Sequence, residues 1–226
     1  SREHQKIKPG GCGGGPGLEH LYTTGLLYHY YLTGNPQSRE LVLGLADWVL
    51  RIIDQPQTFI GALHSLKKKQ FLWKEVRKGN RIRSDIFPFT RGSGNAVTAL
   101  LDAWSLEGKE LYIRKAEEII RGCIHPADDI ESRNLLNAEV GWSYNVCLQA
   151  VGKYLDVKLE KGELDKMYDY AKASLLHYAK WMLEHEYPYL DKTEILEYPN
   201  ETWPAQDMRK SCVFYYAAKH SHGDLR

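Results

Sequence analysis

The chain has 226 residues, and its 30 Lys and Arg nearly balance its 29 Asp and Glu, which leaves a formal net charge of +1. This balance gives no reason to expect a nucleic-acid partner, and no apolar run reaches the roughly 18 residues of a membrane span, so we expect no membrane partner either. Aromatic residues make up 12% of the chain, including 15 Tyr and 6 Trp, which supply many flat side chains for stacking.

Helical periodicity dominates the chain and predicts an all-α fold, with helices over about 18–33, 37–53, 93–107, 109–122, 139–157, 163–184 and 204–220. Gly34, Gly108 and Gly162 follow or separate these helices, and glycine suits the left-handed position just past a helix C-terminus. The helices therefore pair into hairpins at about 18–53, 93–122 and 139–184, followed by half a hairpin at 204–220. We interpret residues 1–226 as one domain or a fragment of one.

The two helices of each hairpin differ in where their apolar residues lie. The first is apolar on most faces, as Leu100 and Leu101 illustrate, and the second has a single apolar stripe, as Leu45 and Trp48 illustrate. A helix that is apolar all round must be covered on both sides, whereas a striped helix lies at the surface. This alternation predicts an α/α toroid of inner and outer helices. Three and a half hairpins do not close a ring, so we expect the rest of a longer chain or further copies of this chain to complete it.

Long connections join each hairpin to the next, at about 54–92, 123–138 and 185–203, whereas the turns within hairpins are short. Because hairpins are antiparallel, the long loops fall at one end of the toroid, and long loops in a compact domain are often functional. The first of them also predicts a small β-hairpin near 71–87. Nine Lys or Arg lie between residues 64 and 91, where they form either a lip that attracts anionic glycans or a solvated loop.

Polar and aromatic residues recur where the first helix of each hairpin begins, and this combination suits sugars. Pyranose faces stack on aromatic rings, while carboxylates, amides and Arg bond to hydroxyl groups. Glycoside hydrolysis commonly needs two carboxyl groups, for which we favour Glu201 and Asp207, and His20 would serve as the base of an epimerase or lyase. Helix capping is the alternative role for each acid. The expected carbohydrate contacts are Glu19, Arg91, Asn95, Glu139, Trp142, Tyr144, Trp203 and Gln206.

The four cysteines, Cys12, Cys123, Cys147 and Cys212, are widely spaced and form no C-x-x-C motif. This spacing predicts free thiols, with a zinc site or disulfides as the alternatives. Unpaired thiols favour the cytoplasm, although the sequence does not determine the compartment. We expect no cofactor and no bound metal.

One phrase of the sequence resembles the six-hairpin glycosidase-like superfamily, which includes N-acylglucosamine 2-epimerase-like proteins, unsaturated glucuronyl hydrolases and polysaccharide lyases. The phrase is Gly25-Leu26-Leu27-Tyr28-His29-Tyr30-Tyr31-Leu32-Thr33-Gly34-Asn35, followed by Leu45-Ala46-Asp47-Trp48-Val49-Leu50. The resemblance implies an α/α toroid of carbohydrate-active type. It carries over no catalytic residue, because no subfamily's catalytic motif is present and one fold hosts many reactions.

The sequence therefore predicts a carbohydrate-active enzyme, in first place a glycoside hydrolase acting on an oligo- or polysaccharide that is neutral or acidic. A sugar epimerase or polysaccharide lyase on the same fold is one alternative, and a non-catalytic glycan-binding or scaffold domain is another. The positions of Glu201 and Asp207 distinguish these classes. Hydrolysis gains support if both face a central cavity near another carboxyl group, and the binding domain gains support if they only cap helices or form ion pairs.

Overall fold

The computed structural model describes residues 17–54 and 87–221, and these residues are helical with no strand among them. The helices are α1 (Thr24–Thr33), α2 (Pro36–Asp54), α4 (Arg91–Glu107), α5 (Glu110–Cys123), α6 (Ala138–Gly141), α7 (Tyr144–Glu160), α8 (Lys166–His185) and α9 (Thr202–His220), with short 3-10 helices at Leu18–His20, Glu131–Arg133 and Tyr189–Ile195. The all-α prediction is confirmed for this part of the chain. The predicted β-hairpin at 71–87, most of the basic stretch and Cys12 lie outside the described residues.

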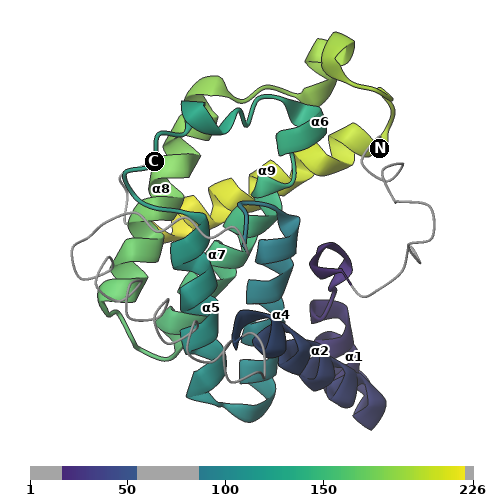
Figure 1. The fold of residues 1–226 in the computed structure, drawn as a ribbon, viewed down its shortest axis with the longest axis vertical. Coiled ribbons are helices and arrows are strands. Elements are labelled where there is room, and N and C mark those ends of the chain that lie inside the picture. Colours follow the sequence, from purple (N-terminus) through teal and green to yellow (C-terminus); the bar gives the residue numbers. More distant parts are fainter. Residues whose placement is uncertain (1–16, 55–86, 222–226) are drawn as a thin grey trace, which may run out of the picture.

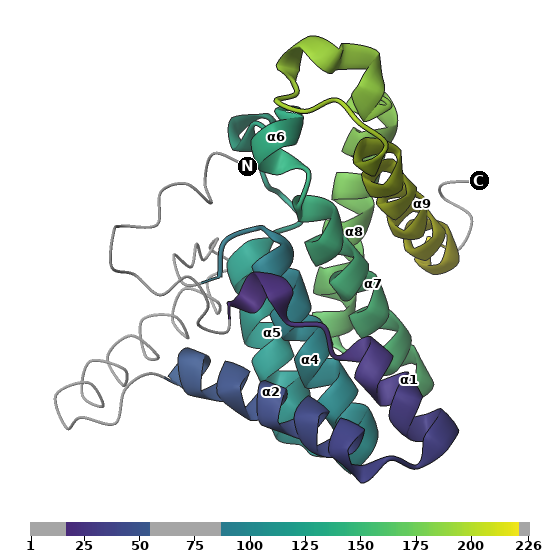
Figure 2. The ribbon, with the colours of Figure 1, turned by 90° about the vertical axis from the view of Figure 1, so that its right-hand side faces the viewer.

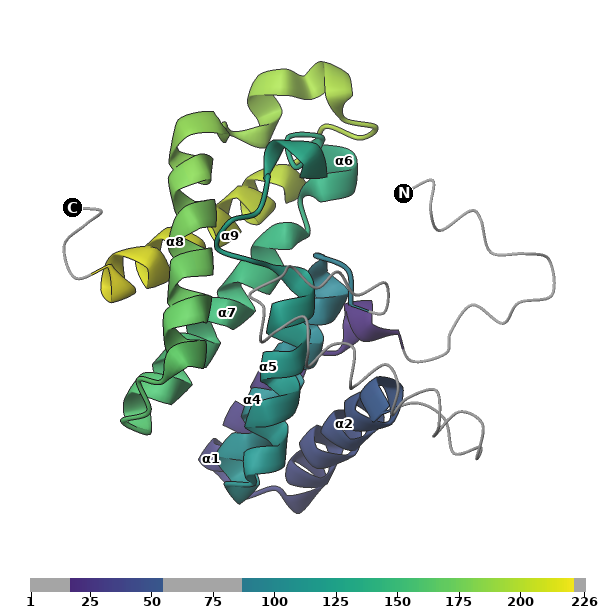
Figure 3. The same cartoon turned by 60° about the vertical axis from the view of Figure 1, so that its left-hand side comes forward.

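The helices pair in sequence order and form two layers (Figure 1). Helices α1, α4, α7 and α9 contact one another in succession and form one layer. Helices α2, α5 and α8 lie behind them, with α2 against α1 and α4, α5 against α4, and α8 against α7 and α9. Figure 2 shows α1 and α9 on the same side of the central pair α4 and α7, and Figure 3 shows α5 and α8 on the other side.

Helices α4 and α7 form the centre of the core because small residues let their backbones approach. A Cβ atom at Gly94 of α4 would lie only 2.6 Å from the carbonyl oxygen of Val146 in α7. A Cβ at Gly152 of α7 would lie 2.2 Å from the ring of Tyr216 in α9, so glycine also permits the α7–α9 contact. Leu100, Leu101, Leu148, Leu155 and other buried apolar side chains fill the space between these helices and the outer layer.

Helix α1 differs from the predicted inner helix. Although its sequence is apolar on most faces, Leu27 is its only buried residue, and Tyr28, Tyr31 and Leu32 are exposed. Among the described helices, α1 packs mainly against α2 and makes fewer contacts with α4. The expectation of cover on both sides is therefore wrong for α1 within the described residues, whereas most residues of the neighbouring α4 are buried.

Two predicted helices are also interrupted. The first begins at Thr24 rather than near residue 18, because the hydroxyl groups of Thr23 and Thr24 donate to Asp102 of α4 and fix the chain there. The third inner helix divides into α6 and α7 at Trp142 and Ser143. A Cβ at Gly141 would lie 2.7 Å from the carbonyl oxygen of Leu135, so the preceding loop packs tightly on this break. None of the described helices combines the length and apolar character that crossing a membrane requires.

Candidate binding hollow

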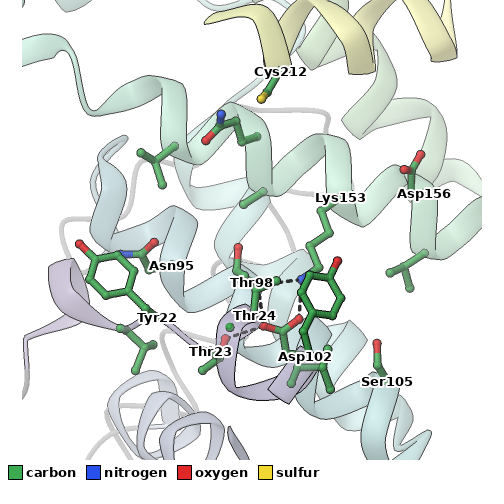
Figure 4. A pocket seen from close by; sticks show the side chains of 18 of the residues that line it. Tyr22, Thr23, Thr24, Asn95, Thr98, Asp102, Ser105, Lys153, Asp156 and Cys212 are labelled. Atoms are coloured by element: carbon green, nitrogen blue, oxygen red, sulfur yellow. Dashed lines mark hydrogen bonds and ion pairs between the residues drawn. The ribbon is translucent and has the colours of Figure 1, made fainter. Parts of the chain in front are cut away.

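A hollow of about 1240 Å³ lies on the face formed by α1, α4, α7 and α9. All four helices contribute lining residues, some of which Figure 4 shows. The hollow exceeds the roughly 300–1000 Å³ of common small-molecule sites. We name it the main hollow.

A polar stripe runs down the side of α4 that lines the main hollow. Its members are three or four residues apart, which places them on one face of a helix: Arg91, Asn95, Thr98, Asp102 and Ser105. Helix α7 carries a second stripe with the same spacing: Gln149, Lys153, Asp156 and Glu160. These side chains interrupt otherwise apolar helices, and they line the main hollow instead of entering the core.

The middle of the main hollow holds a connected cluster, Asp102 with Lys153, Thr23 and Thr24, which we name the floor cluster. Asp102 is fully buried, and its Oδ2 accepts hydrogen bonds from Thr23 Oγ1 at 2.6 Å and Thr24 Oγ1 at 2.9 Å. Its Oδ1 forms an ion pair with Lys153 Nζ, which also donates to Thr24 Oγ1 at 3.2 Å. Figure 4 shows these side chains converging from three helices, so the cluster joins α1, α4 and α7.

Aromatic side chains surround the floor cluster. Tyr22, Tyr28 and Tyr31 line the main hollow from the α1 side and are more than half exposed, while Trp104 and Tyr216 line it from α4 and α9. The Tyr31 hydroxyl donates to the carbonyl oxygen of Ser105. Partial burial and the nearby Asp102 carboxylate raise the pKa of Tyr31, so its phenol keeps its proton at neutral pH. The aromatic faces are therefore uncharged surfaces available for stacking.

A smaller hollow of about 360 Å³ lies where the long loops meet the first ends of the inner helices, and we name it the rim hollow. Arg91 and Trp142 line both hollows, with the Arg91 guanidinium 5.6 Å from the centre of the Trp142 ring. Arg91 also forms an ion pair with Glu19 at 2.8 Å. The structure thus brings together five of the residues expected to contact carbohydrate, which line the rim hollow: Glu19, Arg91, Glu139, Trp142 and Trp203.

The three expected catalytic residues line neither hollow. Glu201 is exposed at the position before α9, and its side chain makes no capping hydrogen bond. Asp207 forms an ion pair with Lys210 at 2.8 Å and accepts a hydrogen bond from the backbone N–H of Tyr189 at 3.0 Å. His20 is exposed in the short helix Leu18–His20, where its ring meets Tyr22 edge to face.

The other residues expected to contact carbohydrate have two different roles: two line the main hollow, and one is buried and supports a loop. Asn95 and Gln206 line the main hollow, and the Asn95 amide also donates to the carbonyl oxygens of Leu18 and Glu19. Tyr144 is fully buried and its hydroxyl donates to Glu186. Burial and the Glu186 carboxylate raise the pKa of Tyr144, so this residue supports the loop as a neutral donor.

One cation of the main hollow has no acidic partner among the described residues. Arg209 of α9 donates from Nε to the Gln206 side chain at 2.8 Å, and no carboxylate pairs with it. By contrast, Lys153 pairs with Asp102 and Arg91 pairs with Glu19. Asp156 pairs with Lys219 at 2.8 Å and with His220 at 2.9 Å. Arg209 therefore offers its remaining N–H donors to the main hollow.

The described residues contain no group of three or more His, Cys, Asp or Glu arranged to hold a metal ion. Cys123 and Cys147 are buried free thiols, and Cys212 is an exposed free thiol that lines the main hollow. No protein-family model, curated protein or solved structure matches the chain.

Proposed function

We propose that the main hollow binds an oligosaccharide, and that the four inner helices form an arc of an α/α toroid. The observation that carries the proposal is the combination of polar stripes with aromatic side chains on one concave face. A sugar ring presents an apolar face and a rim of hydroxyl groups, so it needs both kinds of partner. Tyr28 and Tyr31 supply aromatic faces, and Asn95, Thr98 and Gln149 supply donors and acceptors.

Binding without hydrolysis agrees best with the positions of the carboxyl groups. Hydrolysis commonly needs a carboxylic acid and a second carboxyl group on either side of the scissile bond. Within the main hollow, Asp102 is buried and bonded on both oxygens, and Asp156 is held by Lys219 and His220. The third lining carboxyl group, Glu160, is exposed at the last residue of α7, so it supplies at most one of the two groups that hydrolysis commonly needs. The geometry therefore favours the glycan-binding interpretation over the hydrolase, epimerase and lyase interpretations of the sequence.

An acidic glycan fits the main hollow as well as a neutral one. The guanidinium of Arg209, which pairs with no carboxylate among the described residues, would form charge-assisted hydrogen bonds with a sugar carboxylate or sulfate, and these are stronger than bonds to neutral hydroxyls. Arg209→Gln should therefore weaken the binding of uronate-containing oligosaccharides and leave the binding of neutral ones unchanged.

The test is titration of the full chain with neutral and uronate-containing oligosaccharides by calorimetry. Tyr28→Ala should weaken binding about two- to tenfold through the loss of one stacking surface. Tyr215→Ala is the matched control, because Tyr215 is equally exposed on α9 but does not line the main hollow. Equal losses in the two variants, or no binding by any oligosaccharide, would show that the main hollow is not a glycan site.

Alkylation of Cys212 gives a second measurement of where the glycan binds. Cys212 is an exposed thiol in the main hollow, so a bound glycan should slow its reaction with a maleimide. Cys212→Ser supplies the background from the other cysteines. An unchanged rate under saturating glycan would place the bound sugar elsewhere.

Catalysis is tested separately by incubating the same oligosaccharides with the chain and measuring reducing ends. We expect no increase over the spontaneous rate. Turnover that disappears in Glu201→Gln or Asp207→Asn, with the fold intact, would instead restore the hydrolase interpretation and its predicted residues.

A further inference from the structure

We infer that the ligand of the main hollow is an extended chain of several sugar units lying along α4 and α7, rather than a single sugar. This inference rests on the proposed function, since it concerns the size and direction of the glycan in the same site. Three features of the main hollow support it: the length of the lined surface, the aromatic residues at both ends of that surface, and the polar residues at its centre.

The lined surface follows the full length of α4 and most of α7. Both ends of α4 contribute, from Arg91 at its first residue to Gly108 just past its last, and α7 contributes from Val146 to Glu160. At 1.5 Å per residue, the α4 side alone spans roughly 25 Å. One pyranose covers only a fraction of this length, so a single sugar would leave most of the polar stripe facing water.

Aromatic groups mark both ends of this length. Trp142 lies at the first end, beside Arg91. Trp104 and Tyr31 lie at the other end, where Tyr31 donates to the Ser105 carbonyl oxygen and Lys161 lies 5.3 Å from the centre of the Trp104 ring. A chain that stacks at both ends must cross the middle of the hollow.

The middle of the hollow offers a fixed hydrogen-bond donor. Lys153 uses two of its three N–H donors on Asp102 and Thr24, and its side chain is 25% exposed. Since its position is set by these bonds, the remaining donor has a defined direction and costs little ordering on binding. The middle of the glycan would therefore be held by a hydrogen bond and its ends by stacking.

The experiment measures affinity against chain length, using gluco-oligosaccharides and oligogalacturonates from the single sugar to chains longer than the hollow. We expect the dissociation constant of the better-binding series to fall with each added unit and then level off when the hollow is filled. A dissociation constant that is the same for the single sugar and the longest chain would overturn the inference while leaving the proposed function intact. Failure of every length to bind would overturn the proposed function itself.

Two variants test the two ends. Trp142→Ala and Tyr31→Ala should each weaken the binding of the longest chain about two- to tenfold. In both variants the dissociation constant should level off at a shorter chain length. Tyr215→Ala should leave the whole length profile unchanged, and urea unfolding establishes that each variant is folded. An equal loss for the single sugar and the longest chain in both end variants would indicate one compact subsite and would overturn the inference.

Discussion

The floor cluster and the loop that precedes α9 use charged residues in different ways. In the floor cluster, Asp102 of α4 and Lys153 of α7 form an ion pair that lines the main hollow. Beside the rim hollow, Lys210 of α9 pairs with Glu186 and Asp207 and donates to the carbonyl oxygen of Tyr187, so it ties the last long loop to a helix. Acids near this loop hold the loop in place, whereas polar residues on α4 and α7 shape the main hollow.

The largest expected effect on stability comes from the floor cluster. Asp102→Ala leaves Lys153 without its ion pair and the Thr23 and Thr24 hydroxyls without their acceptor. Removing one partner of a buried ion pair typically costs about 3 kcal/mol or more, so we expect the free energy of unfolding to fall by about that amount in urea titrations.

The double variant Asp102→Leu with Lys153→Met is the control, because it removes both charges. It should recover most of the lost stability, since replacing a whole buried pair by apolar residues is often neutral. A single variant as stable as the original chain would mean that the floor cluster does not join the helices as described.

The second largest effect on stability is expected where α4 and α7 pack closely at Gly94. Gly94→Ala would place a Cβ atom 2.6 Å from the Val146 carbonyl oxygen and 2.8 Å from the Cys147 Cα, so α4 and α7 must separate. We expect a loss of about 2 kcal/mol in the free energy of unfolding, measured by urea titration.

Gly44→Ala in α2 is the matched control, because no described residue outside the adjoining turns of α2 lies within 4 Å of the added Cβ. There the better helix propensity of alanine should raise stability by up to about 1 kcal/mol. If the two variants changed stability by the same amount, close packing at Gly94 would not be what holds the central pair together.

A smaller effect is expected beside the rim hollow. Asp207→Asn removes the charge that faces Lys210 and weakens the bond to the Tyr189 N–H, while Glu186 still pairs with Lys210. The free energy of unfolding, measured by urea titration, should fall by about 1 kcal/mol, and glycan binding should be retained. Full stability combined with loss of a measured glycosidase activity would contradict the supporting role and identify Asp207 as catalytic.

The sequence could predict the helices because most are long and periodic, and because a glycine follows α1, α4 and α7. Gly34, Gly108 and Gly162 all have positive φ, between 64° and 71°, as the hairpin turns required. The starts were less predictable, because tertiary bonds set them. The Thr23 hydroxyl donates to Asp102, 79 positions away, and local sequence carries no record of that partner.

The candidate site was harder to predict for a related reason. The loop residues drew attention because their types suit sugar chemistry, yet the partners of Asp207 and Tyr144 are fixed only by the packed loop. Asp102 and Lys153 were missed although a signal was present. Polar residues at helical spacing within an apolar helix, from Arg91 to Ser105, indicate a face that the core does not cover.

The smallest expected effect is a pH dependence at the α9 end of the main hollow. His220 is buried, its Nε2 lies 2.9 Å from Asp156, and its Nδ1 lies 3.1 Å from the Tyr168 hydroxyl. Burial lowers the pKa of His220 and outweighs the opposing Asp156 hydrogen bond, with Lys219 and Lys172 also disfavouring the charged ring. Below about pH 6.5 the unfolded chain therefore binds this proton more readily than the folded chain.

The contribution of His220 to stability is accordingly complete above about pH 6.5 and is lost as the pH falls toward the lower pKa of the folded state. Urea titrations at several pH values should show the free energy of unfolding declining over this window, with a shallower decline in His220→Gln. A steeper decline in the variant, or stability that rises on acidification of the original chain, would mean that the Asp156 ion pair outweighs burial and that His220 is charged beside the hollow.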